Sequence, residues 1–120
     1  SWGGYLGFSH ALQQPKGLRG MINADGIASW SKFSESCLNW IEQLPEDHRK
    51  VIQHGLKTGQ YDSPEFKASS EYFYSLHVCR LVPNPAEVTY TFTRAAEDTT
   101  VYETMNGPNE FTVIGSMKDE

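Results

Sequence analysis

Apolar residues in the middle of the chain recur at helical spacing. Between Ala28 and Pro45 they fall mostly three and four positions apart, at Trp30, Phe33, Cys37, Trp40, Ile41 and Leu44. Residues at this spacing lie on one face of an α-helix, and a proline is not tolerated inside a helix. The pattern therefore predicts a helix that buries one apolar face and ends before Pro45.

Two further segments carry helix signals at their ends. The stretch "EDHRKVIQHGLKTG" begins with acidic residues and ends with glycine, which suits the two ends of a helix dipole. The stretch "DSPEFKASSEYFYSLHVC" has Ser63 in position to cap a helix and Pro64 at its first turn. Within it, one face is apolar: Phe66, Phe73 and Leu76. We predict a helix in each stretch.

The N-terminal part of the chain predicts a helix followed by a strand. Residues 2–14 are mostly apolar and small, and Pro15 ends them. The segment from Leu18 to Ala24 is short, apolar and bounded by glycines, which favours a buried strand. A helix followed closely by a buried strand is typical of an α/β sheet.

The segment "AEVTYTFTRAAED" is ambiguous. Val88, Tyr90 and Phe92 alternate with threonines, which favours a strand, whereas Ala95, Ala96 and the acidic residues suit the end of a helix. The last ten residues, "FTVIGSMKDE", are too few to classify.

Composition narrows the possible partners. The chain has 120 residues with 10 Lys and Arg against 15 Asp and Glu, a net charge of −5 that disfavours binding to nucleic acid. It has no apolar run of the roughly 20 residues that a membrane helix requires. Cys37 and Cys79 form no C-x-x-C pair, which favours two reduced thiols in a cytoplasmic protein. His48 and His54 are six positions apart, which is not a helical metal-ligand spacing.

The opening residues are one candidate for chemistry. Ser1-Trp2-Gly3 matches the second half of the G-x-S-x-G elbow, in which a serine on a sharp strand-to-helix turn is the nucleophile of a hydrolase. The backbone N–H groups at such a helix N-terminus can bind developing negative charge. Three-residue matches are common, so the local pattern alone favours an ordinary terminal serine.

The segment "VYETMNGPNEF" is the second candidate. Gly107 and Pro108 predict a turn after Asn106, and this turn would fix the direction of Glu110, eight residues after Tyr102. A carboxylate held in this way could bind an ammonium group, with the tyrosine adding a hydroxyl or an aromatic face. A glutamate is more often a solvated surface charge, and the residues alone favour that interpretation.

At these two places the chain resembles a known family. Four stretches carry the resemblance: "SWGG" with its apolar helix, "EYFYSLHVCR", "VYETMNGPNEF" and "GSMKD". They are similar to the proline iminopeptidase (prolyl aminopeptidase) family of α/β-hydrolases. The resemblance implies that Ser1 is the nucleophile and that the backbone N–H of Trp2 is an oxyanion-hole donor. It also implies that Glu110 and Tyr102 hold the free α-amino group of a substrate, and it implies no metal or organic cofactor.

The resemblance also implies a domain organisation. Residues 1–26 would be part of the α/β-hydrolase core, with the elbow, one core helix and a short core strand. Residues 27–110 would form a mainly α-helical cap, and residues 111–120 would return to the core. With the family in view, we expect the ambiguous segment from Ala86 to Asp98 to be helical.

Some family residues have no counterpart here. The family places its catalytic aspartate and histidine after the cap and a glycine-rich oxyanion loop before the elbow, so Asp119 is not the triad aspartate. All the histidines precede the expected position: His10, His48, His54 and His77. We expect a fragment that has a nucleophile without its base and that turns over negligibly by itself. We also expect His77, Cys79 and Arg80 to serve packing and hydrogen bonding.

The implied activity is that of a serine aminopeptidase. It would release N-terminal proline or small apolar residues from short peptides through an acyl-enzyme, and its partners would be such peptides and the rest of the hydrolase domain. Two alternatives stay open. One is an amino-acid amidase or esterase on the same fold, and the other is a non-enzymatic truncated cap or interaction module.

Overall fold

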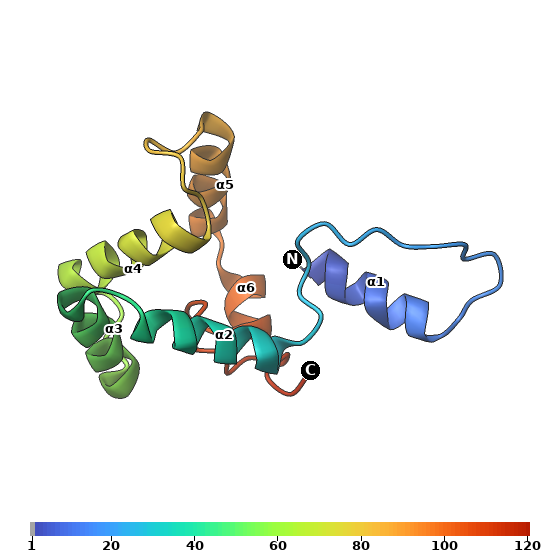
Figure 1. Ribbon diagram of the computed structural model, residues 1–120, viewed down its shortest axis with the longest axis horizontal. Helices are drawn as coiled ribbons and strands as arrows, with labels where there is room; N and C mark the ends of the chain where they lie inside the picture. The colour runs from blue at the N-terminus through green and yellow to red at the C-terminus, as the bar shows by residue number, and fades with distance from the viewer. Residues whose placement is uncertain (1) are drawn as a thin grey trace.

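The computed structural model describes residues 2–120, which form helices joined by turns and irregular segments (Figure 1). In chain order the helices are α1 (Trp2–Leu12), α2 (Trp30–Glu42), α3 (Glu46–Thr58), α4 (Pro64–His77), α5 (Ala86–Glu97) and α6 (Thr100–Met105). Helices α2 to α4 form a packed unit, α5 projects from it, and α1 lies to the other side with the long segment that follows it (Figure 1).

The three central helices form where the spacing predicts them, and their ends follow the predicted chemistry. The Ser63 side chain accepts the backbone N–H of Phe66 at 3.1 Å, and Pro64 occupies the first turn of α4. Helix α3 ends at Gly59, whose φ of 72° is a left-handed conformation that glycine adopts at little cost. The predictions for α2, α3 and α4 are confirmed.

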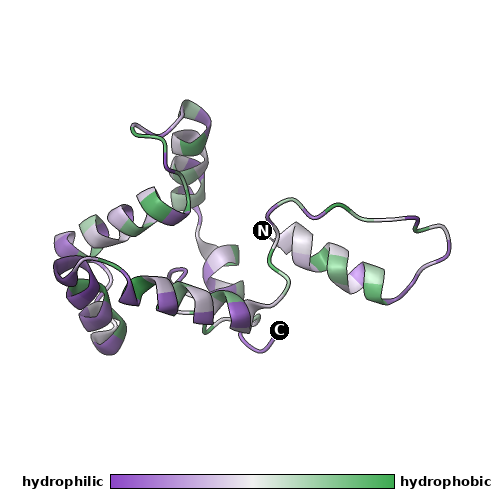
Figure 2. Ribbon diagram, viewed as in Figure 1, coloured by the Kyte–Doolittle hydropathy of each residue, from purple (hydrophilic) through white to green (hydrophobic). Residues whose placement is uncertain are grey.

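The core lies where α2, α3 and α4 meet, and one residue from the C-terminal segment completes it. The buried members of this cluster are Cys37, Ile41, Leu44, Ile52, Phe66, Phe73 and Phe111. Hydrophilic residues cover most of the outer surface of α3, whereas α1 is mostly apolar or neutral (Figure 2). The central helices therefore bury their apolar face and expose their polar face to solvent, as their amphipathic sequence pattern predicts.

The segment after α1 does not form the predicted strand. Residues 14–29 contain no strand, and the only strand-like pairing among residues 2–120 is an isolated bridge between Asn109 and Thr112. A strand is stabilised by hydrogen bonds to a neighbouring strand, and no such neighbour lies beside Leu18–Ala24 in this part of the chain. The prediction of a short core strand is therefore wrong for this structure.

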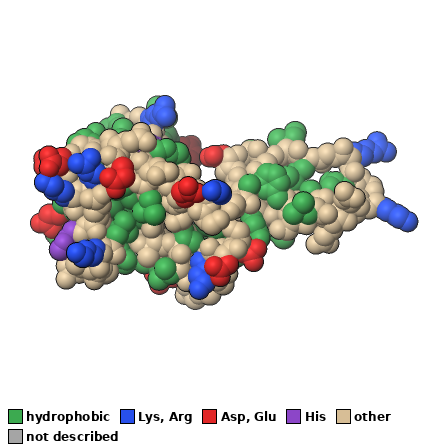
Figure 3. All heavy atoms as spheres, turned by 60° about the horizontal axis from the view of Figure 1, so that its bottom comes forward, with side chains coloured by type: hydrophobic (Ala, Val, Ile, Leu, Met, Phe, Trp, Pro, Cys, Tyr) green, Lys and Arg blue, Asp and Glu red, His purple; other side chains and the backbone are tan. Residues whose placement is uncertain are grey.

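Helix α1 and its loop expose much of their apolar surface. No residue of α1 is buried, and Leu6, Leu12 and Ile22 are 70%, 84% and 96% exposed. Hydrophobic side chains gather on this lobe, as the space-filling view shows (Figure 3). The loop returns to the helix where two glycines meet: a Cβ added to Gly4 would lie 2.6 Å from the Cα of Gly26.

The ambiguous segment is helix α5, as the family resemblance favours, and the strand alternative is wrong. Its residues are mostly exposed, and only Val88 is half-buried. The last ten residues form no helix but pack back against α6: the backbone N–H groups of Ile114 and Gly115 both donate to the carbonyl oxygen of Asn106 at 2.9 Å. No helix in the described part of the chain is both long and apolar enough to cross a membrane.

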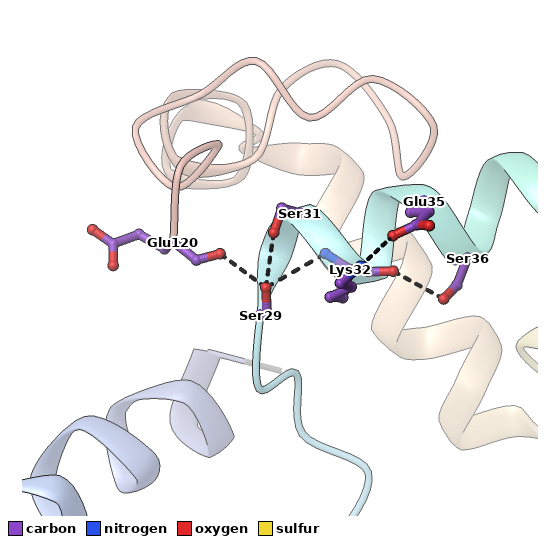
Figure 4. A network of polar contacts seen from close by, with 6 residues as sticks. All are labelled: Ser29, Ser31, Lys32, Glu35, Ser36 and Glu120. Atoms are coloured by element: carbon purple, nitrogen blue, oxygen red, sulfur yellow. Dashed lines mark hydrogen bonds and ion pairs between the residues drawn. The ribbon is translucent and has the colours of Figure 1, made fainter.

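The C-terminal residue meets the start of α2 (Figure 4). The carbonyl oxygen of Glu120 accepts the N–H of Trp30 at 2.8 Å and the hydroxyl of Ser29 at 3.3 Å. The Ser29 hydroxyl oxygen in turn accepts the N–H of Lys32. These bonds satisfy N–H groups at the helix start that have no acceptor within the helix. The Glu120 side chain also accepts the hydroxyl of Tyr5, which connects α1 to the C-terminal segment.

The contact between α3 and α4 leads to a stability prediction. A Cβ added to Gly55 would lie 2.4 Å from the ring of Phe66 and 3.1 Å from the carbonyl oxygen of Gln60. We expect Gly55→Ala to lower the free energy of unfolding by about 1 kcal/mol, because overpacking costs about 1–3 kcal/mol and the gain in helix propensity returns only about 1 kcal/mol. Thermal or urea unfolding of the chain measures this difference.

The matched control lies one residue earlier on the same helix. His54 is exposed, so His54→Ala should leave the free energy of unfolding unchanged or slightly raised. If Gly55→Ala stabilised the protein as much as His54→Ala, the close packing of α3 on α4 described here would be wrong.

Candidate functional site

Two tyrosines from different helices meet around one carboxylate. Glu110 lies in the turn after α6, and its Oε1 accepts the hydroxyl of Tyr102, from α6, at 2.9 Å. Its Oε2 accepts the hydroxyl of Tyr74, which comes from α4. Both carboxylate oxygens are therefore bound by phenol hydroxyls, one on each side.

The turn that carries Glu110 depends on one glycine and one buried aromatic ring. Gly107 has a φ of 131°, and a Cβ there would lie 2.2 Å from the carbonyl oxygen of Thr112, so no other residue fits without strain. Asn109 Oδ1 accepts the N–H of Phe111 at 3.0 Å. Phe111 is 4% exposed and belongs to the core. This buried neighbour sets the direction in which Glu110 leaves the turn.

A buried asparagine connects the turn to the tyrosine. The Asn106 side chain is 1% exposed, and its amide donates to the Tyr102 hydroxyl oxygen at 3.2 Å and to the Asn109 carbonyl oxygen at 2.9 Å. Tyr102 thus accepts one hydrogen bond from Asn106 while it donates another to Glu110. Such a chain of hydrogen bonds polarises each member and strengthens the last bond to the carboxylate.

The electrostatics of the cluster keep both tyrosines protonated. Burial, followed by the charge of Glu110, raises the pKa of Tyr74 and of Tyr102 far above the usual value for a phenol. Burial also raises the pKa of the Cys37 thiol to about 11, with Glu110 adding to the effect. At neutral pH the two tyrosine hydroxyls and the Cys37 thiol near the carboxylate are therefore neutral.

Glu110 has no cationic partner in the described part of the chain. The ion pairs there are exposed and involve other carboxylates: Lys32–Glu35, Lys50–Glu46, Lys67–Asp62 and Arg94–Glu97. A half-buried carboxylate that is hydrogen-bonded but not neutralised remains attractive to a cation. The arrangement can therefore receive a cationic group.

An apolar cleft opens beside Tyr74. Its volume is about 480 Å³, and its walls come from α4, the segment after it and α5. Its apolar side chains are Val78, Leu81, Val82 and Phe92. The ring of Tyr74 stacks on Phe92 with centroids 6.4 Å apart, so this tyrosine has its hydroxyl on the carboxylate and its ring on the cleft wall.

The structure describes three of the four predicted site residues and brings two of them into contact. Glu110 and Tyr102 lie in direct contact. Trp2 opens α1, where backbone N–H groups have no acceptor within the helix. Ser1 lies outside the described residues, so its role as the nucleophile stays a prediction.

The "LHVCR" residues make packing contacts and hydrogen bonds. His77 stacks on Trp40 with ring centroids 4.7 Å apart, and Arg80 Nε donates to the carbonyl oxygen of Leu76 at 3.1 Å. Both cysteines are free: Cys37 is buried and Cys79 is half-buried.

Tyr74 is the site residue that sequence reasoning missed. It lies inside "EYFYSLHVCR", next to Phe73, and nothing in its local spacing distinguishes it from Tyr72, the other tyrosine of α4. Its role follows from a contact across 36 positions, which a single sequence does not reveal.

No model of a protein family matches the chain, but individual proteins do, and their matches run almost end to end. The chain is 38% identical to the proline iminopeptidase of Saccharolobus solfataricus and 36% identical to that of Thermoplasma volcanium, in each case over 99% of its length. The chain is homologous to the proline iminopeptidases. The family resemblance inferred from the sequence is therefore confirmed.

Solved structures agree with this relationship. The crystal structure of the proline iminopeptidase from Mycobacterium smegmatis matches with a TM-score of 0.85 at 36% identity. The crystal structure of VinJ matches with a TM-score of 0.89 at 40% identity, and each match covers 99% of this chain. The chain spans about two fifths of the length of these proline iminopeptidases and of VinJ.

The thiol beside Glu110 gives a prediction that depends on pH. Because the pKa of Cys37 is raised to about 11, only about 0.1% of this thiol is ionised at pH 8, and its reactivity should keep rising up to about pH 11. We expect an alkylating reagent at pH 8 to modify the half-buried Cys79 first and to leave Cys37 largely unmodified. Peptide mass spectrometry after timed alkylation measures the two rates.

Denaturation supplies the control for this prediction. In urea the two thiols should react at similar rates, because burial no longer protects Cys37. Equal rates in the native protein would contradict the buried position of Cys37 beside the carboxylate.

Proposed function

We propose that this chain is the substrate-recognising part of a serine aminopeptidase of the prolyl type. The observation that carries the proposal is Glu110, a carboxylate held by two tyrosine hydroxyls with no cation paired to it in the described part of the chain. The homology to proline iminopeptidases supports the same activity. The enzyme would release N-terminal proline or a small apolar residue from short peptides.

Glu110 would bind the free α-ammonium group of the substrate. An aminopeptidase must recognise the charged end of a peptide and cleave one residue from it. An oriented carboxylate can recognise that end by a charge-assisted hydrogen bond to the ammonium group. Tyr102 and Tyr74 fix both oxygens, so less side-chain entropy is lost when the ligand binds. The apolar cleft beside Tyr74 would receive the apolar part of the bound peptide.

Ser1 would attack the carbonyl carbon of the first residue. The serine oxygen forms a bond to that carbon, the amine of the next residue leaves, and water then hydrolyses the acyl-enzyme. The backbone N–H of Trp2, at the start of α1, would stabilise the oxyanion. The general base and the aspartate that orients it would come from the part of these proteins that this chain does not cover. We therefore expect the 120 residues alone to be inactive.

The domain organisation is part of the same proposal. Residues 1–26 would belong to the hydrolase core, residues 27–110 would form the cap, and residues 111–120 would return to the core. The exposed apolar side chains of α1 and its loop support this division, because a hydrolase sheet would bury them.

Blocking the substrate amine tests the proposal directly. We expect the complete enzyme to hydrolyse a proline arylamide and to lose nearly all activity toward the N-acetylated form, which has no ammonium group for Glu110. We expect Glu110→Gln to lower kcat/KM for the free-amine substrate by about 10- to 100-fold, because a hydrogen bond to a charged group contributes about 1.5–3 kcal/mol. Steady-state kinetics on both substrates measures the two effects.

Glu103→Gln is the matched control, since Glu103 is an exposed glutamate on α6 and should not affect kcat/KM. An amidase or esterase of the same fold would share Ser1 without needing Glu110. Equal rates on the free and acetylated substrates would therefore reject amine recognition and favour that alternative.

A further inference from the structure

We propose that Asn106 and Gly107 form a deamidation site that the folded turn keeps closed and that opens when the turn unfolds. The inference goes beyond the proposed function, because the modification depends on the chemistry of these two residues and not on what Glu110 binds. Asparagine is one of the thermolabile residues of proteins. Here it directly precedes a glycine, whose backbone nitrogen no side chain shields.

The reaction joins the side chain of Asn106 to the backbone of Gly107. The Gly107 nitrogen forms a bond to the side-chain carbon Cγ of Asn106, and the bond from Cγ to Nδ2 breaks. The side-chain nitrogen leaves as ammonia and takes the proton of the Gly107 N–H, so that a five-membered succinimide ring remains. Water then opens the ring at one of its two C–N bonds. Opening at Cγ gives aspartate, and opening at the backbone carbonyl carbon gives isoaspartate.

The fold restrains both reacting groups and excludes water from them. Asn106 is 1% exposed, and Gly107 is buried as well. Asn106 Nδ2 donates to the Tyr102 hydroxyl oxygen at 3.2 Å and to the Asn109 carbonyl oxygen at 2.9 Å. The Gly107 N–H donates to the carbonyl oxygen of Tyr102 at 3.4 Å. The attack has to break these bonds and to release a proton where no solvent reaches, so the folded turn keeps the reaction slow.

The turn cannot avoid the reactive pair, because its geometry requires both residues. Gly107 has a φ of 131°, and a Cβ there would lie 2.2 Å from the carbonyl oxygen of Thr112. Asn106 needs an amide, because an aspartate in its place has no N–H to donate to Tyr102. The same two residues that hold Glu110 in place therefore make the turn chemically labile.

Either product prevents the turn from returning to its original structure. Aspartate replaces the donor of Asn106 by a charged acceptor that faces the Asn109 carbonyl oxygen. Isoaspartate lengthens the backbone by one carbon, and it converts into a free carboxylate the backbone carbonyl that accepts the N–H groups of Ile114 and Gly115. A chain that is modified while unfolded is thus lost to the native state, which makes unfolding irreversible over time.

Timed incubation of the complete enzyme at mildly alkaline pH, native and in guanidinium chloride, tests the inference. Peptide mass spectrometry with fragmentation measures conversion at each asparagine. We expect Asn106 to convert at least about tenfold faster in denaturant than in the native enzyme, because only the open turn reacts.

Two other asparagines supply controls in the same sample. In denaturant, Asn106 should also convert at least about tenfold faster than Asn39, because the side chain of Trp40 hinders the attack there. Asn84 should form no succinimide in either condition, because the nitrogen of Pro85 carries no hydrogen. Equal rates at Asn106 in the native and denatured enzyme would overturn the inference, and so would a rate in denaturant no higher than that of Asn39.

Activity after refolding separates this inference from the proposed function. We expect the lost fraction of proline arylamide hydrolysis to follow the modified fraction at Asn106, and this expectation rests on the role of Glu110. In Asn106→Gln, whose longer side chain would have to close a larger ring, the activity measured after refolding should no longer fall with time in denaturant. Modification at Asn106 with full activity would support the deamidation site and would count against amine binding by Glu110.

Discussion

The burial of Phe111 against α4 is the contact on which the site depends. Its ring lies 4.8 Å from that of Phe73 and 6.5 Å from that of Phe66, inside the core formed by α2, α3 and α4. Because Phe111 directly follows Glu110, burying the ring draws the carboxylate to the side of α4 where Tyr74 lies. A hydrophobic interaction, which has no direction of its own, thus positions a polar group to within hydrogen-bond distance.

The carboxylate of Glu110 is hydrogen-bonded on both oxygens but has no paired cation in the described part of the chain. A partly desolvated charge requires partners, and two phenols supply hydrogen bonds without cancelling the charge. A lysine or arginine in either place would pair with the carboxylate and would occupy the place of an incoming cation. The choice of neutral donors is typical of a binding site, where some stability is given up for function.

The sequence predicted what depends on local spacing and could not predict what depends on distant contacts. The apolar stripe of α2 and the cap at Ser63 were sufficient to place their helices, because helix formation is decided within a few turns. The strand at Leu18–Ala24 was predicted wrongly, since a strand requires a partner that residues 2–120 do not provide. The turn at Gly107 could be inferred from the residues, and the joint role of Glu110 and Tyr102 was inferred only from the family resemblance. Tyr74 required the packing of α4 against the C-terminal segment.

The central claim is that Glu110 receives the substrate amine opposite the Ser1 hydroxyl. A crystal structure of the complete enzyme with a proline-derived aldehyde tests it most directly, because a serine nucleophile adds reversibly to such a carbonyl. The account predicts a bond from Ser1 Oγ to the aldehyde carbon and a ligand nitrogen within hydrogen-bond distance, about 3 Å, of the Glu110 carboxylate. A ligand nitrogen that points to solvent or to another residue, with Glu110 outside the cavity that holds Ser1, would contradict the account.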